Sequence, residues 1–161
     1  MSNANLDTSD CEIEEENEGN NENRFLTFKL GDEEYGLEIN YVKEVVGLQK
    51  ITAMPDVPRY IKGIINLRGQ VIPIMDARAR FNLSEKAYND RTCVVVIDVD
   101  TTYLGLIVDE VKDVLEIPEE KISAPPKMYH AEKSQFIRGL GKHDDAVKIL
   151  LDVSTLFDQS Q

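Results

Sequence analysis

Residues 35–46, YGLEINYVKEVV, return in similar form as residues 104–115, LGLIVDEVKDVL. The two stretches share a glycine at the second position, a lysine at the ninth, and apolar residues at the same places near the end. Internal similarity of this length indicates that the chain is built from two similar units. Because only two copies are present, a solenoid of stacked repeats is excluded.

Two more pairs of matching segments follow in the same order. Ile61-Lys62-Gly63 resembles Ile137-Arg138-Gly139, and residues 71–76 resemble residues 147–152. The separation between matched residues grows from 69 (104 minus 35) to 76 (147 minus 71). The second unit therefore carries an insertion, which we place near residues 125–134.

Each unit predicts two β-hairpins, because runs of β-branched and aromatic residues flank short turns. The hairpins expected in the first unit join residues 25–30 to 35–39, and residues 64–67 to 70–76. Those expected in the second unit join residues 92–99 to 103–108, and two strands within residues 138–152. Short strands with tight turns favour two small barrels over a parallel α/β sheet.

A short amphipathic helix is predicted after the first hairpin of each unit. In the first unit, helical spacing joins Ile39, Val42, Val45 and Val46, and in the second unit it joins Ile107, Val111, Val114 and Leu115. We expect a first barrel subdomain over residues 24–90 and a second over residues 91–152. A C-terminal helix is predicted over residues 153–161.

The charge of the chain excludes several classes of partner. There are 18 basic and 30 acidic residues, which give a net charge of −12. Such a surplus repels phosphate backbones and anionic lipid head groups, so neither nucleic acid nor a membrane surface is an expected partner. No stretch approaches the roughly 20 apolar residues that a membrane-spanning helix needs.

Much of this charge lies in the first 23 residues, which have no basic or aromatic side chain. The acidic residues of this segment are Asp7, Asp10, Glu12, Glu14, Glu15, Glu16, Glu18 and Glu22. A segment of this composition cannot bury enough apolar area to offset its ordering entropy, so we predict a disordered acidic tail. A docking role for the tail is the alternative. Without these eight charges, the rest of the chain has a net charge of −4.

No group of residues shows a catalytic arrangement. No spacing places His130 or His143 with Cys or carboxylate ligands in a zinc pattern. Residues 138–142, RGLGK, lack the first glycine of a phosphate-binding loop. Cys93 lies in a Val/Ile run and is expected to be a core residue. We therefore predict no enzyme activity, no catalytic residue, no metal site and no cofactor.

The hairpin tip at Arg68-Gly69 has two interpretations. In the structural one, Gly69 supplies the positive φ of the turn and Arg68 is solvated. In the functional one, Arg68 reaches over the expected first helix and pairs with Glu44, since a guanidinium can hold a carboxylate with two hydrogen bonds. Such a pair would orient a surface for recognition.

Residues 63–78, GIINLRGQVIPIMDAR, closely resemble the signature of the CheW family of bacterial chemotaxis coupling proteins. Residues 25–47 are similar to the opening of that family, and residues 108–111, VDEV, are similar to its second half. The resemblance runs in order over residues 24–157. One departure is Ala77, where the family usually has leucine, and we expect a small packing change there.

The resemblance implies two intertwined five-stranded SH3-like β-barrels with short helices, and a non-enzymatic adaptor. CheW-like proteins join the cytoplasmic tips of methyl-accepting chemotaxis receptors to the regulatory domain of the histidine kinase CheA. The resemblance therefore implies these two partners, without direct membrane insertion. It also implies a cytoplasmic location, in receptor arrays at the inner membrane.

By the same resemblance, the receptor tip would dock in a groove between the barrels, and the kinase would contact exposed barrel ends. The matching receptor-binding positions are Ile39, Val42, Glu44, Val45, Lys62, Gly63 and Arg68. For Val42 and Val45, burial in the core is the competing interpretation. Two other functions stay open: a CheW-like regulatory module of a larger signalling protein, and an unrelated small-barrel protein that binds a ligand.

Overall fold

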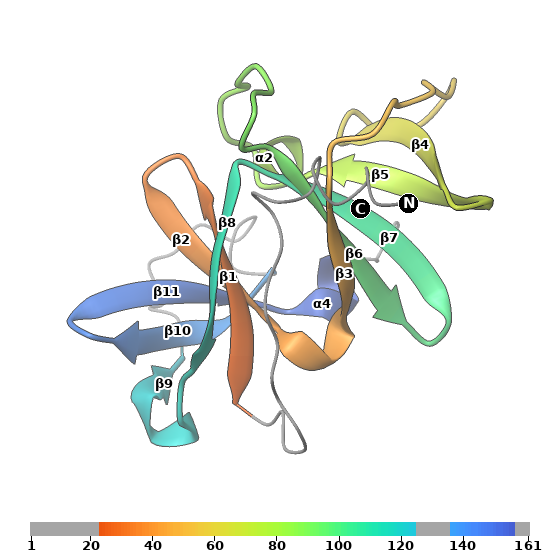
Figure 1. Ribbon diagram of the computed structural model, residues 1–161. Coiled ribbons are helices and arrows are strands. Elements are labelled where there is room, and N and C mark those ends of the chain that lie inside the picture. The colour runs from red at the N-terminus through yellow and green to blue at the C-terminus, as the bar shows by residue number, and fades with distance from the viewer. Residues whose placement is uncertain (1–22, 125–135, 157–161) are drawn as a thin grey trace.

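The computed structural model describes residues 23–124 and 136–156 of the 161-residue chain. These residues form two β-sheets and four short helical segments, and Figure 1 shows the two sheets side by side. The mainly β fold class predicted from the sequence is confirmed. The predicted acidic tail, the predicted insertion and the end of the predicted C-terminal helix lie largely or wholly outside the described residues.

Sheet A has six strands in the order β8-β1-β2-β11-β10-β9. Its strands are β1 Arg24–Leu30, β2 Glu33–Glu38, β8 Glu110–Glu116, β9 Ile122–Ser123, β10 Ile137–His143 and β11 Ala146–Leu151. Sheet B has five strands in the order β3-β6-β7-β5-β4. Its strands are β3 Val42–Gly47, β4 Ile61–Leu67, β5 Gln70–Asp76, β6 Cys93–Val99 and β7 Thr102–Val108. The helical segments are η2 Ile39–Tyr41, α2 Ala77–Arg80, η3 Glu119–Lys121 and α4 Val153–Leu156.

Each sheet contains strands from both sequence repeats. The hairpin β1–β2 of the first repeat lies in sheet A, between β8 and β11 of the second repeat. The hairpin β6–β7 of the second repeat lies in sheet B, between β3 and β5 of the first. The two repeats have therefore exchanged their first hairpins, so that strands of both sheets lie on each side of the sequence boundary at residues 90 and 91.

The four predicted hairpins are present, each with a two-residue turn. Both residues have positive φ angles in the turns Arg68-Gly69, Asp100-Thr101 and Asp144-Asp145. Turns of this kind match the right-handed twist of the strands that they join. In the fourth turn, Gly31-Asp32, only the glycine has a positive φ angle.

The prediction of two amphipathic helices is wrong. Residues 39–46 form the single turn η2 followed by strand β3, and residues 107–115 span the end of β7 and most of β8. Val45 packs against one hydrophobic cluster and Val46 belongs to another, on the opposite face of β3. A bulge between Val42 and Glu44 also shifts the register. A bulged strand with apolar residues on both faces loses the alternation that identifies strands, and its spacing imitates a helix.

The internal repeat is visible in the hydrogen bonds that end each unit. The N–H of Asp76 donates to the carbonyl of Tyr60, and the N–H of Asp152 donates to the carbonyl of Phe136, both at 2.8 Å. Each aspartate then caps the helix that follows it. The carboxylate of Asp76 accepts from the N–H of Arg78 at 2.9 Å, and that of Asp152 accepts from the N–H of Ser154 at 3.1 Å.

The hydrophobic core lies mainly between the two sheets. A central cluster combines residues of both, including Leu26 and Phe28 of β1 with Val95 and Ile97 of β6. A second cluster, with Val94, lies on the other face of β6, and a smaller one lies within sheet A. Residues 93–97 of β6 are buried on both faces and form a continuous apolar run.

Candidate functional site

The predicted pair of Arg68 and Glu44 is present as an ion pair and hydrogen bond between Nη2 and Oε2. Glu44 lies on β3, and Arg68 lies in the turn between β4 and β5, held by the hydrogen bond from the Gly69 N–H to the Asn66 side chain. The side chains of Arg68 and Glu44 are 66% and 26% exposed. Water and a partner protein can therefore reach the guanidinium while the pair is intact.

This pair lies at one end of what we call the closing seam, where the chain leaving β3 returns alongside β4. At the other end, the N–H groups of Thr52 and Ile64 donate to each other's carbonyls at 2.9 Å. These two contacts join β3 and the residues after it to β4, the opposite edge of sheet B, and so close the sheet into a barrel.

Gly63 lies in this seam for a steric reason. Its φ angle is +146°, and a Cβ placed on it would lie 2.1 Å from the carbonyl oxygen of Thr52. The matching Gly139 approaches the carbonyl of Ser123 in the same way, at 2.9 Å for an added Cβ. The repeated Ile-Lys/Arg-Gly motif therefore marks the place where each barrel closes.

The other predicted receptor-binding residues differ in their exposure. Val42 and Val45 are half-buried against the central cluster, and Ile39 is buried within it. Lys62 is half-buried near the opposite end of β4 from Arg68, so about 20 Å of strand separates them. The structure therefore brings Glu44 and Arg68 together at one end of the seam, and places Gly63 and its neighbour Lys62 at the other end.

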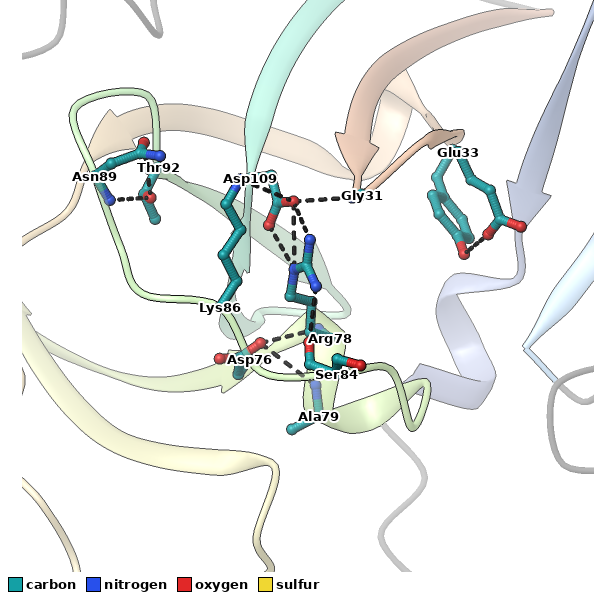
Figure 2. Close-up of polar contacts among 11 residues, drawn as sticks. Gly31, Glu33, Asp76, Arg78, Ala79, Ser84, Lys86, Asn89, Thr92 and Asp109 are labelled. Carbon is teal, nitrogen blue, oxygen red and sulfur yellow. Dashed lines mark hydrogen bonds and ion pairs between the residues drawn. The ribbon is translucent and has the colours of Figure 1, made fainter.

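A polar cluster around Asp109 was not assigned a role from the sequence. Asp109 lies between β7 and β8, where the chain passes from sheet B to sheet A. Its carboxylate accepts hydrogen bonds from Arg78 Nε at 2.9 Å, from Arg78 Nη2 at 2.7 Å and from the Gly31 N–H at 2.9 Å. Figure 2 shows Arg78 reaching this carboxylate, with Lys86 beside it.

These contacts tie four parts of the chain to one carboxylate. Arg78 also donates from Nη1 to the carbonyl of Ser84 at 2.7 Å, which fixes the segment between the repeats (Figure 2). Burial acts to raise the pKa of Asp109, but the hydrogen bonds from Arg78 and Gly31 and the charge of Arg78 together lower that pKa. The pKa of Arg78 is raised, chiefly by its hydrogen bond to Asp109. Both groups are therefore charged at neutral pH.

Arg78 and Asp109 are 31 residues apart, and no local spacing rule connects them. Both residues lie in the segments that resemble the CheW family, residues 63–78 and 108–111, but the resemblance gave neither of them a role. Within the described residues, no group of three His, Cys, Asp or Glu side chains is arranged to hold a metal ion. None of the helices in this part of the chain is long and apolar enough to cross a membrane.

Comparison with known proteins identifies the fold family. The model of the CheW-like domain matches residues 24–161. The chain belongs to the CheW-like family. It is 35% identical to the chemotaxis protein CheW of Klebsiella aerogenes over 137 residues, which are 85% of this chain and 82% of that protein. It is 32% identical to CheW of Bacillus subtilis, over 84% of this chain and 87% of that protein.

A solved CheW structure agrees with this assignment. The scaffolding protein TtCheW of Thermoanaerobacter tengcongensis matches with a TM-score of 0.79 and 35% identity, over 86% of this chain and 94% of that chain. The CheW-like chain is therefore a chemotaxis coupling adaptor and not an enzyme. The CheW-like match begins at the first residue of β1 and does not include the acidic residues before it.

Proposed function

We propose that this CheW-like adaptor couples the cytoplasmic tips of methyl-accepting chemotaxis receptors to the regulatory domain of the histidine kinase CheA. It acts in the cytoplasm, in receptor arrays at the inner membrane. The observation that carries the proposal is the Arg68–Glu44 pair, an accessible cation fixed on a barrel by a carboxylate of the neighbouring strand. The family assignment supports it, and so does the similarity to TtCheW, which is a scaffolding protein.

The receptor tip contacts the edge strand β3 and the closing seam. Val42 and Val45 supply half-buried apolar surface there, and Glu44 and Arg68 supply fixed charges of both signs. On sheet A, the edge strand β8 contributes the half-buried Val114 to the same central cluster. An apolar strip with a few charges at its border suits the helical hairpin of a receptor tip. Multiple copies in an array add avidity to a moderate affinity.

The kinase contacts two barrel faces that occupy matching places in the repeats. Val71 on β5 and Val147 on β11 are 59% and 52% exposed, and they are separated by the repeat offset of 76 residues (147 minus 71). Exposed valines at equivalent places suit a partner whose own domain is CheW-like, because related surfaces can then meet at both ends. Single exposed apolar residues are common on protein surfaces. The proposed kinase contact therefore rests on the equivalent positions of the two valines in the repeats, and not on their exposure alone.

The receptor contact is tested with charge variants and a receptor cytoplasmic fragment in a pull-down and by calorimetry. We expect Glu44→Lys and Arg68→Glu each to weaken receptor binding by at least about tenfold, the loss of roughly 1.4 kcal/mol of contact energy. Circular dichroism should show an unchanged fold, because an exposed pair stabilises a protein by only about 0–1 kcal/mol. The combined variant Glu44→Arg with Arg68→Glu should restore the pair but not the binding.

Two variants serve as matched controls. Arg138→Ala removes a comparable ion pair with Glu38, outside the proposed contact, and should leave receptor binding unchanged. Val71→Asp should weaken binding of CheA and leave receptor binding intact. If the charge-swapped double variant binds receptor normally, the pair acts only by closing the barrel. If Glu44→Lys or Arg68→Glu unfolds the protein, the residues are structural and the proposed contact fails.

A further inference from the structure

An apolar pocket of about 200 Å³ is lined by residues of the loop after β3, by strands β4, β5 and β7, and by Leu156 of helix α4. Its lining includes Met54, Val57, Tyr60, Pro73, Tyr103 and Leu156. Met54 is 41% exposed at its mouth, in the loop between β3 and β4. None of the seven proposed receptor-binding residues lines this pocket.

Basic residues contact the lining of this pocket or lie next to lining residues in the chain. The Nζ of Lys43 lies 5.3 Å from the centre of the Tyr103 ring. Arg59 stands between the lining residues Pro58 and Tyr60, and Lys62 directly follows the lining residue Ile61. We call Lys43, Arg59 and Lys62 the basic rim. Glu44 directly follows Lys43 but pairs with Arg68, Asp56 lies in the loop before Arg59, and Asp98 lies opposite Tyr103 in the sheet.

No cation of the basic rim forms an ion pair among the described residues. Each ion pair found among the described residues involves other basic side chains, such as Arg78, Arg138 and Lys148, and none involves the basic rim. Residues 41–75 contain five basic and two acidic residues, a net charge of +3 (5 minus 2) in a chain of net charge −12. A ligand that fits this surface has acidic groups to pair with the basic rim and an apolar side chain to enter the pocket.

We propose that the acidic segment of residues 1–22 of this chain binds across the basic rim, with an aliphatic side chain such as Ile13 at the pocket. This segment has eight acidic and no basic residues, and Ile13 lies between Glu12 and Glu14. Its charge is therefore complementary to the rim, and its apolar residue is flanked by the charges that the rim binds.

The length of the segment permits this contact. The chain enters the fold at Asn23, whose carbonyl accepts from the N–H of Ile117. An extended stretch of 22 residues spans up to about 75 Å, whereas a domain of this size is about 40 Å across. Tethering gives the segment an effective concentration in the millimolar range, so weak pairs suffice. The contact should respond to salt, because the Debye length falls to a few ångströms at high ionic strength.

Binding of the segment would cover Lys62 and so compete with the receptor. This consequence rests on the proposed function, whereas the contact itself does not. The test of the contact therefore uses the full chain without any receptor or kinase. If the contact fails, the proposed function is untouched. If the receptor variants above fail, the contact can still be present.

The test compares amide spectra of the ¹⁵N-labelled full chain with those of a variant that carries Gln at positions 12, 14, 15, 16 and 18. At about 0.02 M salt, we expect amides of residues 50–62 and of Tyr103 to shift between the two proteins. At about 0.5 M salt, the two spectra should coincide in this region. In a Lys43→Gln/Arg59→Gln background, the same tail substitutions should no longer shift these amides.

A matched control removes the same number of positive charges at a place outside the basic rim. Lys121→Gln/Lys142→Gln removes two exposed lysines outside the rim, and the tail-dependent shifts should persist. The proposal is overturned if the low-salt spectra already coincide. It is also overturned if the shifts gather near Lys29 and Lys86, where a polar pocket lies beside Asp109. If Phe157→Ala shifts the pocket amides and the tail variant does not, residues 157–161 are the occupant instead.

Discussion

At the scale of single residues, Asp109 has more structural partners than any residue singled out from the sequence. Its carboxylate bonds to Arg78 of α2 and to the Gly31 turn of sheet A, and through Arg78 it fixes the carbonyl of Ser84. The side chains of Arg78 and Asp109 are only 14% and 15% exposed. Removing one partner of a buried pair leaves the other charge without compensation, and typically costs about 3–5 kcal/mol.

We expect Asp109→Asn to lower the free energy of unfolding by about 3 kcal/mol at pH 7. The pKa of Asp109 in the folded protein lies below its ordinary value of 3.8. Its contribution is therefore complete above that value and is lost as the pH falls through the folded-state pKa. Urea unfolding of wild type and variant at pH 7, at about pH 5 and near pH 3 should show a difference that narrows only in acid.

Asp113→Asn is the matched control, because Asp113 lies on β8, four residues after Asp109, and is exposed. It should change the free energy of unfolding by less than about 0.5 kcal/mol at any of these pH values. A difference for Asp109→Asn that is the same at every pH would show that shape, and not charge, is what this carboxylate contributes.

At the scale of elements, the hairpins could be predicted from the sequence and strand β3 could not. The turns can be recognised from residues such as Gly31-Asp32 and Asp144-Asp145, because these residue types tolerate or favour positive φ angles. In β3, the bulge at Val42 and Glu44 and the burial of Val45 and Val46 on opposite faces remove the strand pattern. The pairing of Arg68 with Glu44 was still anticipated, because it depends on side-chain chemistry and not on the element that carries Glu44.

Closure of the barrel by the seam gives a prediction for Gly63. We expect Gly63→Ala to lower the free energy of unfolding by more than about 2 kcal/mol, because the added Cβ meets the backbone of Thr52, which cannot move aside cheaply. Gly69→Ala is the control: its φ angle is also positive, at +88°, but an added Cβ meets nothing within 4 Å. This control should cost only the conformational penalty of about 1–2 kcal/mol. Equal costs for the two variants in chemical unfolding would contradict the steric role of Gly63.

At the scale of the whole molecule, the two-unit repeat could be read from the residues themselves, whereas intertwined barrels were implied only by the family resemblance. Matching segments such as Ile61-Lys62-Gly63 and Ile137-Arg138-Gly139 show that the two units are similar. Each segment forms the same bulged hairpin within its own unit, and this hairpin does not depend on which unit supplies the next strand of the sheet. The choice is made by non-local pairing, in which β3 pairs with β6 and β8 pairs with β1. The Asp109 contacts follow from that choice, which is why local spacing could not reveal them.

The exchange predicts that neither repeat folds by itself. Residues 1–90 without the second repeat would lack β6 and β7 at the centre of sheet B, and residues 91–161 would lack β1 and β2 at the centre of sheet A. Unpaired strand edges and a divided central cluster cannot offset the chain entropy. We expect each fragment alone to give a poorly dispersed amide spectrum, and an equimolar mixture to regain the dispersed spectrum of the full chain. A full chain cleaved between Asp90 and Arg91 after folding should stay assembled, as the control. Cooperative thermal unfolding of residues 1–90 alone would show that the first repeat is an independent domain, and would contradict the exchange as the source of the fold's stability.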